Sequence, residues 1–214
     1  MTPTQIEDAV RAALAPVESV LITTVRDVYA TVATKYHEPD DGCNSQTFGF
    51  LVYHFLRHNI TTTAQDIAQG IDVEVDSPFR FRVGQFRFGL YGLGPHAVDT
   101  IDDAFPNNHN AAGEFALENV QYRFEFGVDA YMPHALVIGH LGNCESGCEQ
   151  IWLAEPLQEC NCAITGWGWS KMLWRWDGQQ RADSAAPEPV LPAPAPARPI
   201  VLTRKKSAEE KPAG

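Results

Sequence analysis

The chain has 214 residues, of which 44% are hydrophobic and 20% are charged, an ordinary composition for a globular protein. Its 16 basic and 27 acidic side chains give a net charge of -11 with histidine neutral. This balance argues against a general nucleic-acid-binding protein, which needs a positive surface opposite the phosphates. No apolar run approaches the roughly 18 residues of a membrane-spanning helix. The first residues lack the basic start and apolar block of a secretory signal, so we expect a cytoplasmic protein without a membrane partner.

The first predicted element is a long helix that begins near Thr4. Apolar residues recur at steps of three and four from Ile6 to Val32, which keeps them on one face of a helix. Pro16 interrupts this pattern because it has no amide N–H and its ring clashes with the preceding turn. We therefore expect either a kink at Pro16 or a second helix with Pro16 in its first turn.

Two further helices are predicted before the pattern changes. Residues 47–58 place apolar side chains at helical spacing and predict a well-buried helix. Thr62 and Gln65 stand three residues apart, as in a capping box, and predict the start of a short third helix. Gly70 is predicted to end it, since glycine adopts the left-handed conformation readily.

From residue 71 the apolar residues alternate with polar ones, which is typical of strands with one buried face. The segment 71–90 predicts a three-strand meander, in which Gly84 and Gln85 form a two-residue hairpin turn. The predicted register pairs Val73 with Phe81 and sets acids opposite arginines on the other face. The acids of this face are Asp72, Glu74 and Asp76, and the arginines are Arg80, Arg82 and Arg87. We expect these arginines to pair internally rather than to bind a phosphate or carboxylate ligand.

Later segments predict a short helix near 97–104 and strands at 120–128, 135–142 and 149–155. The strand at 135–142 is apolar throughout and is expected to be buried on both faces. The predicted fold class is α+β, with N-terminal helices packed on a mostly antiparallel sheet. One domain is expected over 1–177, helical over 4–69 and sheet-rich over 71–176, followed by a disordered, Pro/Ala-rich tail over 178–214.

The first candidate site is a cluster of thiols with one imidazole nearby. Thiolate and imidazole are the ligands that Zn²⁺ prefers in a tetrahedral shell. The spacing differs from the usual C-x2-C knuckle, and the predicted strand at 149–155 carries the chain away from the first pair. Unconnected thiols and a redox-labile pair therefore stand beside the zinc hypothesis. The residues of this cluster are Cys144, Cys148, Cys160, Cys162 and His140.

A second metal candidate is the pair His54 and His58, which lie four residues apart on one face of a predicted helix. Zinc peptidases use this spacing with a glutamate directly after the first histidine as the general base. Phe55 holds that position here, so the peptidase interpretation fails at its catalytic residue. Two polar residues at the edge of a buried helix are the alternative.

Four tryptophans in the segment 167–176 form a third candidate. Tryptophan buries a large area at low entropic cost and is enriched at protein interfaces. Packing against the sheet is the alternative to a partner-binding surface. These residues are Trp167, Trp169, Trp174 and Trp176.

The sequence contains no complete catalytic set, and it has no nucleotide-binding glycine motif or GxSxG nucleophile motif. We therefore expect a non-catalytic interaction or regulatory module, with an acidic folded body and a flexible docking tail that binds another protein or a second copy of the chain. The alternative is a zinc-binding protein or metal-dependent enzyme that uses the cysteine cluster or the His54/His58 pair. A decoy that imitates DNA is a third hypothesis, which the scarcity of dense acidic stretches disfavours.

Overall fold

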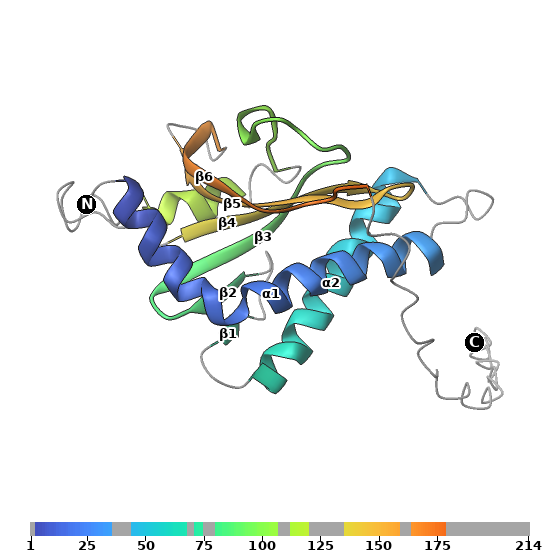
Figure 1. Ribbon diagram of the computed structural model, residues 1–214, viewed down its shortest axis with the longest axis horizontal. Helices are drawn as coiled ribbons and strands as arrows, with labels where there is room; N and C mark the ends of the chain where they lie inside the picture. Colours follow the sequence, from blue (N-terminus) through green and yellow to red (C-terminus); the bar gives the residue numbers. More distant parts are fainter. Residues whose placement is uncertain are drawn as a thin grey trace, which may run out of the picture. The chain divides into compact units, whose positions relative to one another are not determined.

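Helix α1 (Pro3–Lys35) opens the computed structural model, which describes residues 3–35, 44–67, 71–74, 80–106, 112–119, 135–158 and 164–178. The apolar stripe of α1 is buried as its periodicity predicts, and Val10, Leu14 and Val25 are fully covered. The helix continues through Pro16, and its axis changes direction part-way along (Figure 1). The alternative of a separate second helix is therefore wrong, and the bend in α1 agrees with the kink predicted at Pro16.

Helix α2 (Ser45–Ile67) begins after Asn44, whose side-chain oxygen accepts hydrogen bonds from the amides of Gln46 and Thr47, both at 3.0 Å. This is the geometry of an N-cap. The predicted third helix is wrong, because α2 continues without interruption to Ile67. The hydroxyl of Thr62 donates to the carbonyl of His58 at 2.9 Å, inside the helix, rather than capping a new one. Gly70 lies outside the described residues.

A six-stranded sheet follows, with its strands in sequence order. Among the described strands, β3 and β4 pair in parallel and the other neighbouring pairs are antiparallel. The strands are β1 (Ile71–Glu74), β2 (Arg80–Val83), β3 (Phe86–Gly94), β4 (Ala135–Asn143), β5 (Gly147–Leu157) and β6 (Gly166–Arg175). The predicted α+β class with a mostly antiparallel sheet is confirmed. The tail over 178–214 lies outside the described residues except for Gly178.

The predicted register of the first three strands is also confirmed. Val73 is opposite Phe81 and Glu74 is opposite Arg80. Val83 pairs with Phe86 across the two-residue turn, where Gly84 has a φ of 59°, a value that glycine adopts without strain. Asp76 lies outside the described residues.

The predictions for the later part of the chain are only partly confirmed. The strand at 135–142 is present and its first seven residues are buried, as predicted. The predicted helix near 97–104 is reduced to a 3₁₀ turn, η2 (Ile101–Asp103). The predicted strand at 120–128 lies outside the described residues. The segment 157–176, which the sequence did not assign, contains β6.

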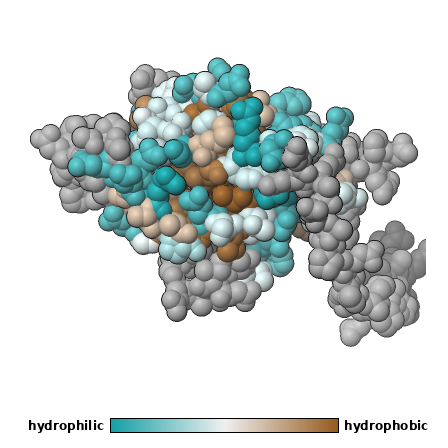
Figure 2. Space-filling view, viewed as in Figure 1, coloured by the Kyte–Doolittle hydropathy of each residue, from teal (hydrophilic) through white to brown (hydrophobic). Residues whose placement is uncertain are grey.

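The sheet is covered on both faces. Helices α1 and α2 pack on one face over a core that includes Phe81, Phe88 and Ile138, and Figure 1 shows both helices on the same side of the strands. The loop 95–106 and a helix over 112–119 pack on the other face, around Phe115 and Trp152. Figure 2 shows a hydrophobic area near the centre of the face seen in Figure 1, surrounded by hydrophilic residues.

Arg80 and Arg87 have a carboxylate partner that the sequence did not predict. Their guanidinium groups lie 3.2 and 2.5 Å from the two carboxylate oxygens of Glu118, on the helix over 112–119. The helix over 112–119 therefore covers this face at Arg80 and Arg87, whereas Arg82 is exposed. No helix in the described part of the chain has a stretch that is both long enough and apolar enough to span a bilayer.

Candidate ligand-binding cavity

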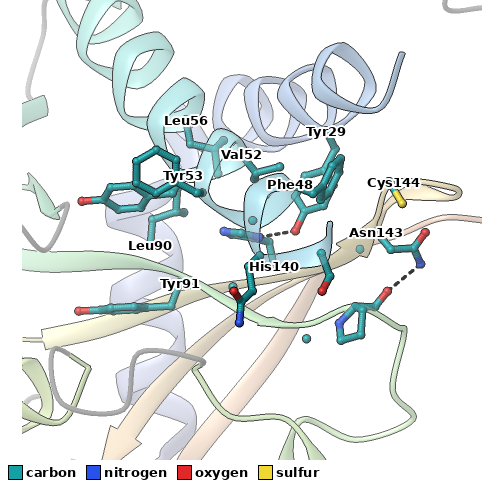
Figure 3. Close-up of a pocket in the computed structure, with 18 residues that line it drawn as sticks. Tyr29, Phe48, Val52, Tyr53, Leu56, Leu90, Tyr91, His140, Asn143 and Cys144 are labelled. Carbon is teal, nitrogen blue, oxygen red and sulfur yellow. Dashed lines mark hydrogen bonds between the residues drawn. The ribbon is translucent and has the colours of Figure 1, made fainter. Parts of the chain in front are cut away.

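A cavity of about 800 Å³ lies between α2 and the carboxyl ends of β3 and β4, and we call it the α2–β4 cavity (Figure 3). Because β3 and β4 are parallel, their carboxyl ends meet at the same edge of the sheet. Tyr29 of α1 reaches the same space. A volume of this size is in the range that holds small organic molecules in proteins.

The described residues that line the α2–β4 cavity include no aspartate, glutamate, lysine or arginine. The walls are mostly aromatic and aliphatic, and a few neutral polar groups stand among them. This is unexpected in a chain with a net charge of -11. The apolar and aromatic residues of the lining are Tyr29, Phe48, Phe50, Val52, Tyr53, Leu56, Leu90, Tyr91 and Pro95.

Glycines at the strand ends leave room beside these walls. Gly92, Gly94 and Gly142 line the cavity and contribute only backbone. A Cβ atom built on Gly142 would lie 2.1 Å from the carbonyl oxygen of Gly147 and 2.7 Å from Cε1 of Tyr29. Glycine at position 142 is therefore needed for the close approach of the Tyr29 ring to β4.

Tyr29 and His140 form the central polar pair of the cavity. The Tyr29 hydroxyl lies 2.7 Å from Nδ1 of His140, and the two rings meet edge to face with centroids 5.5 Å apart. Burial lowers the pKa of His140 to about 4, so the imidazole is neutral at pH 7. Burial, together with the nearby Cys148 and Glu149, raises the pKa of Tyr29 well above its usual value. Both side chains are thus uncharged hydrogen-bonding groups.

Tyr53 lies at the opposite end of the cavity from Asn143 and Cys144, with His140 between them (Figure 3). Tyr91 also lines the cavity, but its ring packs with Phe115 on the other face of the sheet. The Tyr53 hydroxyl is buried and has no hydrogen-bond partner in the described part of the chain. Burial raises the pKa of Tyr91 to about 12, against the opposing effect of Arg80. The Tyr91 phenol is therefore neutral at physiological pH.

The rim beside Asn143 is held by side-chain bonds to the loop after β3. The Asn143 amide donates to the carbonyl of Pro95 at 2.8 Å (Figure 3). Gln150, which is fully buried, accepts from the Val98 amide at 2.9 Å and donates to the Val98 carbonyl at 2.8 Å. This end of the cavity is therefore preformed by hydrogen bonds within the protein.

The structure separates the residues of the predicted zinc cluster that it describes. Cys144 is half-buried and lines the cavity, whereas Cys148 is buried and its thiol faces the carbonyl of Gln150 at 3.8 Å. Both are free thiols, and burial raises the pKa of Cys148 to about 12. His140 has its Nδ1 against Tyr29, and Cys160 and Cys162 lie outside the described residues. No group of three or more potential ligands occurs among the residues that are described. Zinc binding stays a prediction.

His54 and His58 are exposed on α2 and lie outside the cavity lining. The ring of His54 packs against Phe50 and Tyr53, with centroids 4.1 and 5.3 Å away. These contacts give His54 an apolar environment on the outer side of the helix. A metal role for the pair stays a prediction.

The tryptophans are half-buried along β6 and after it. Trp167 donates to the carbonyl of Ile101 at 3.0 Å, and Trp169 packs against the core under α1. Arg26 of α1 lies 4.7 Å above the ring of Trp174, and the Trp176 amide bonds to Glu149. Their role in binding a partner stays a prediction.

Tyr29, Tyr53 and Asn143 line the cavity but were not predicted from the sequence as site residues. One local signal was available, because His140 is a polar residue in an otherwise apolar strand and has glycines close by at 139 and 142. A polar side chain in a buried strand needs a hydrogen-bond partner. No sequence pattern near His140 indicated its partner, Tyr29, which lies 111 residues away in the chain.

Comparisons of the chain with protein-family models, curated proteins and solved structures found no match.

Proposed function

We propose that this chain is a non-catalytic regulatory module that binds a small uncharged molecule in the α2–β4 cavity. The observation that carries the proposal is a cavity of about 800 Å³ whose described lining is aromatic, aliphatic or neutral polar. Ligand sites commonly combine apolar walls with a few placed polar groups. An ionised ligand would lose its hydration without gaining a countercharge from this lining.

The polar groups of the cavity support binding rather than catalysis. A general acid or base works best when its pKa lies near the working pH. His140 has a pKa of about 4 and its Nδ1 is held by Tyr29.

Recognition of a partner protein is the second part of the proposal. Its support is the acidic composition and the Pro/Ala-rich segment after residue 177. The test is a pull-down with the full chain and with a chain shortened at Gly178. Equal recovery of partners from both chains would reject the role of that segment.

The ligand-binding proposal is tested with N-phenyl-1-naphthylamine, a neutral dye whose fluorescence rises in apolar surroundings. We expect saturable binding to the full chain with a stoichiometry of about one dye per chain. Gly49→Leu should weaken binding by about tenfold, because Gly49 lines the cavity and a Cβ there has open space within 4 Å.

The matched control is Gly166→Leu. Gly166 also has open space for a Cβ, but it does not line the cavity. Its dye affinity should equal that of the unchanged protein. Binding that does not saturate, or that is the same in Gly49→Leu and Gly166→Leu, would overturn the proposal.

A further inference from the structure

The hydrogen bond between Tyr29 and His140 sets the tautomer of the imidazole. The Tyr29 hydroxyl has a single polar partner in the described residues, which is Nδ1 of His140. If Nδ1 carried the proton, the buried phenol O–H would have no acceptor. Leaving a buried donor unpaired is unfavourable, so the phenol donates and Nδ1 accepts. The single ring proton of the neutral imidazole is then on Nε2.

Nε2–H of His140 is consequently a donor that faces the cavity. His140 is 6% exposed as a residue, and the described residues show a hydrogen bond at its Nδ1 but none at its Nε2. Nε2 is not among the fully covered unpaired polar atoms of the described residues, so it is open to the cavity. Figure 3 shows the ring between α2 and β3, with its second nitrogen directed away from Tyr29. A donor that is open to the cavity and has no protein partner is a position that a ligand atom can satisfy.

The surroundings of this donor are apolar. Val52, Leu56 and Leu90 line the same part of the cavity, and all three are at least half-buried. In low-dielectric surroundings a hydrogen bond is stronger than in water. A single acceptor placed here therefore selects among ligands of similar shape.

We infer that the ligand of the α2–β4 cavity is an uncharged, largely apolar molecule with a carbonyl or ether oxygen that accepts the Nε2–H of His140. This inference rests on the proposed function, and it specifies the chemical class of the ligand. The apolar part of the molecule lies along Val52 and Leu90. The oxygen lies at His140.

The charge state of the ligand follows from the same residues. A carboxylate at His140 would meet a neutral imidazole and no lysine or arginine in the described lining. A hydrocarbon would leave Nε2–H without an acceptor after water has been displaced. A ketone or ether avoids both penalties.

Three naphthalenes of similar shape test the inference by competition with N-phenyl-1-naphthylamine on the full chain. They are 2-acetylnaphthalene, 2-isopropylnaphthalene and 2-naphthoate. We expect the ketone to bind about fivefold to tenfold more tightly than the hydrocarbon, the range of one neutral hydrogen bond. The naphthoate should bind most weakly.

The variant for this test replaces both members of the polar pair, His140→Leu together with Tyr29→Phe. Removing both partners avoids leaving a buried hydroxyl unpaired. In this variant the ketone and the hydrocarbon should bind equally. A preference that survives the double substitution would overturn the role of His140.

A second measurement does not depend on any variant. Imidazole ¹⁵N chemical shifts of the unchanged protein should show a protonated Nε2 and an unprotonated Nδ1 at His140. The Nε2 signal should shift when 2-acetylnaphthalene binds. The opposite tautomer would overturn the inference.

The outcomes separate the inference from the proposed function. Equal binding of the ketone and the hydrocarbon to the unchanged protein leaves a ligand-binding cavity but contradicts the assigned ligand class. Binding of none of the three compounds, or of the dye, contradicts the proposed function itself.

Discussion

The hydroxyl of Tyr29 and Nδ1 of His140 lie 2.7 Å apart and join α1 to β4 across 111 residues of chain. This contact places a neutral imidazole in the interior, and burial lowers its pKa from the ordinary 6.5 to about 4. The unfolded chain binds a proton at His140 below pH 6.5, whereas the folded chain stays neutral down to about pH 4. Stability should therefore fall as the pH is lowered through this window.

The first prediction concerns the size of that loss. His140 should contribute up to about 3 kcal/mol to the decrease in the free energy of unfolding between pH 7 and pH 4. Urea unfolding at several pH values measures it. The double variant His140→Leu with Tyr29→Phe lacks this titration and serves as the control. Parallel pH curves for the two proteins would contradict the assignment.

The second prediction concerns the close packing at Gly142. A Cβ there meets the backbone oxygen of Gly147 at 2.1 Å, so Gly142→Ala forces the backbone to move. We expect a loss of about 1–3 kcal/mol in the free energy of unfolding. Gly49→Ala is the matched control, because a Cβ on α2 at that position has open space. It should stabilise the protein by about 0.5–1 kcal/mol. Chemical denaturation measures the free energy of unfolding of both variants. A change in the same direction for Gly142→Ala and Gly49→Ala would contradict this prediction.

The third prediction concerns the carboxylate shared by Arg80 and Arg87. Glu118 has a side chain that is 20% exposed, and it contacts both guanidinium groups. Glu118→Gln removes the carboxylate whose two oxygens contact these arginines, so we expect a loss of about 1–3 kcal/mol. The exposed Glu114 is on the same helix, and Glu114→Gln should change stability by less than about 0.5 kcal/mol. A thermal unfolding series distinguishes them.

The fourth prediction concerns Asn119, which is 3% exposed and pairs with both backbone groups of Ala135 at 2.8 Å. Asn119→Ala leaves a buried amide and carbonyl unpaired and should lower stability by about 1–3 kcal/mol. Asn119→Asp sets an ionised oxygen against the Ala135 carbonyl. At low pH the protonated carboxyl can donate again, so this variant should recover stability relative to Asn119→Ala as the pH falls. Identical pH curves for the two variants would refute this reasoning.

The fifth prediction concerns the accessibility of two thiols. Cys144 is half-buried and lines the cavity, whereas Cys148 is buried and burial raises its pKa to about 12. Iodoacetamide at pH 8 should modify Cys144 well before Cys148, because the thiolate is the reactive form. Peptide mapping by mass spectrometry reads each site separately. N-phenyl-1-naphthylamine should slow the labelling of Cys144. Faster labelling of Cys148 than of Cys144 would contradict the structure.

The local patterns of the chain specified most of the secondary structure that the described residues show. The steps of three and four in α1 and the alternation after residue 71 predicted both elements and which faces are buried. The register that pairs Val73 with Phe81 followed from a short turn and the period of a strand. The sequence did not predict where α2 ends, because a threonine can either cap a new helix or bond within an existing one. Here the hydroxyls of Thr61 and Thr62 donate to carbonyls of α2 itself.

The sequence by itself therefore determined the fold class and the element periods, since these depend on neighbours within a few residues. Only the tertiary structure decided the cavity. The parallel pairing of β3 with β4 requires a long crossover, and it brings Gly92 beside His140. Tyr29 and Glu118 likewise find their partners far along the chain. Such contacts depend on how elements pack in three dimensions, which periodicity within one segment does not encode.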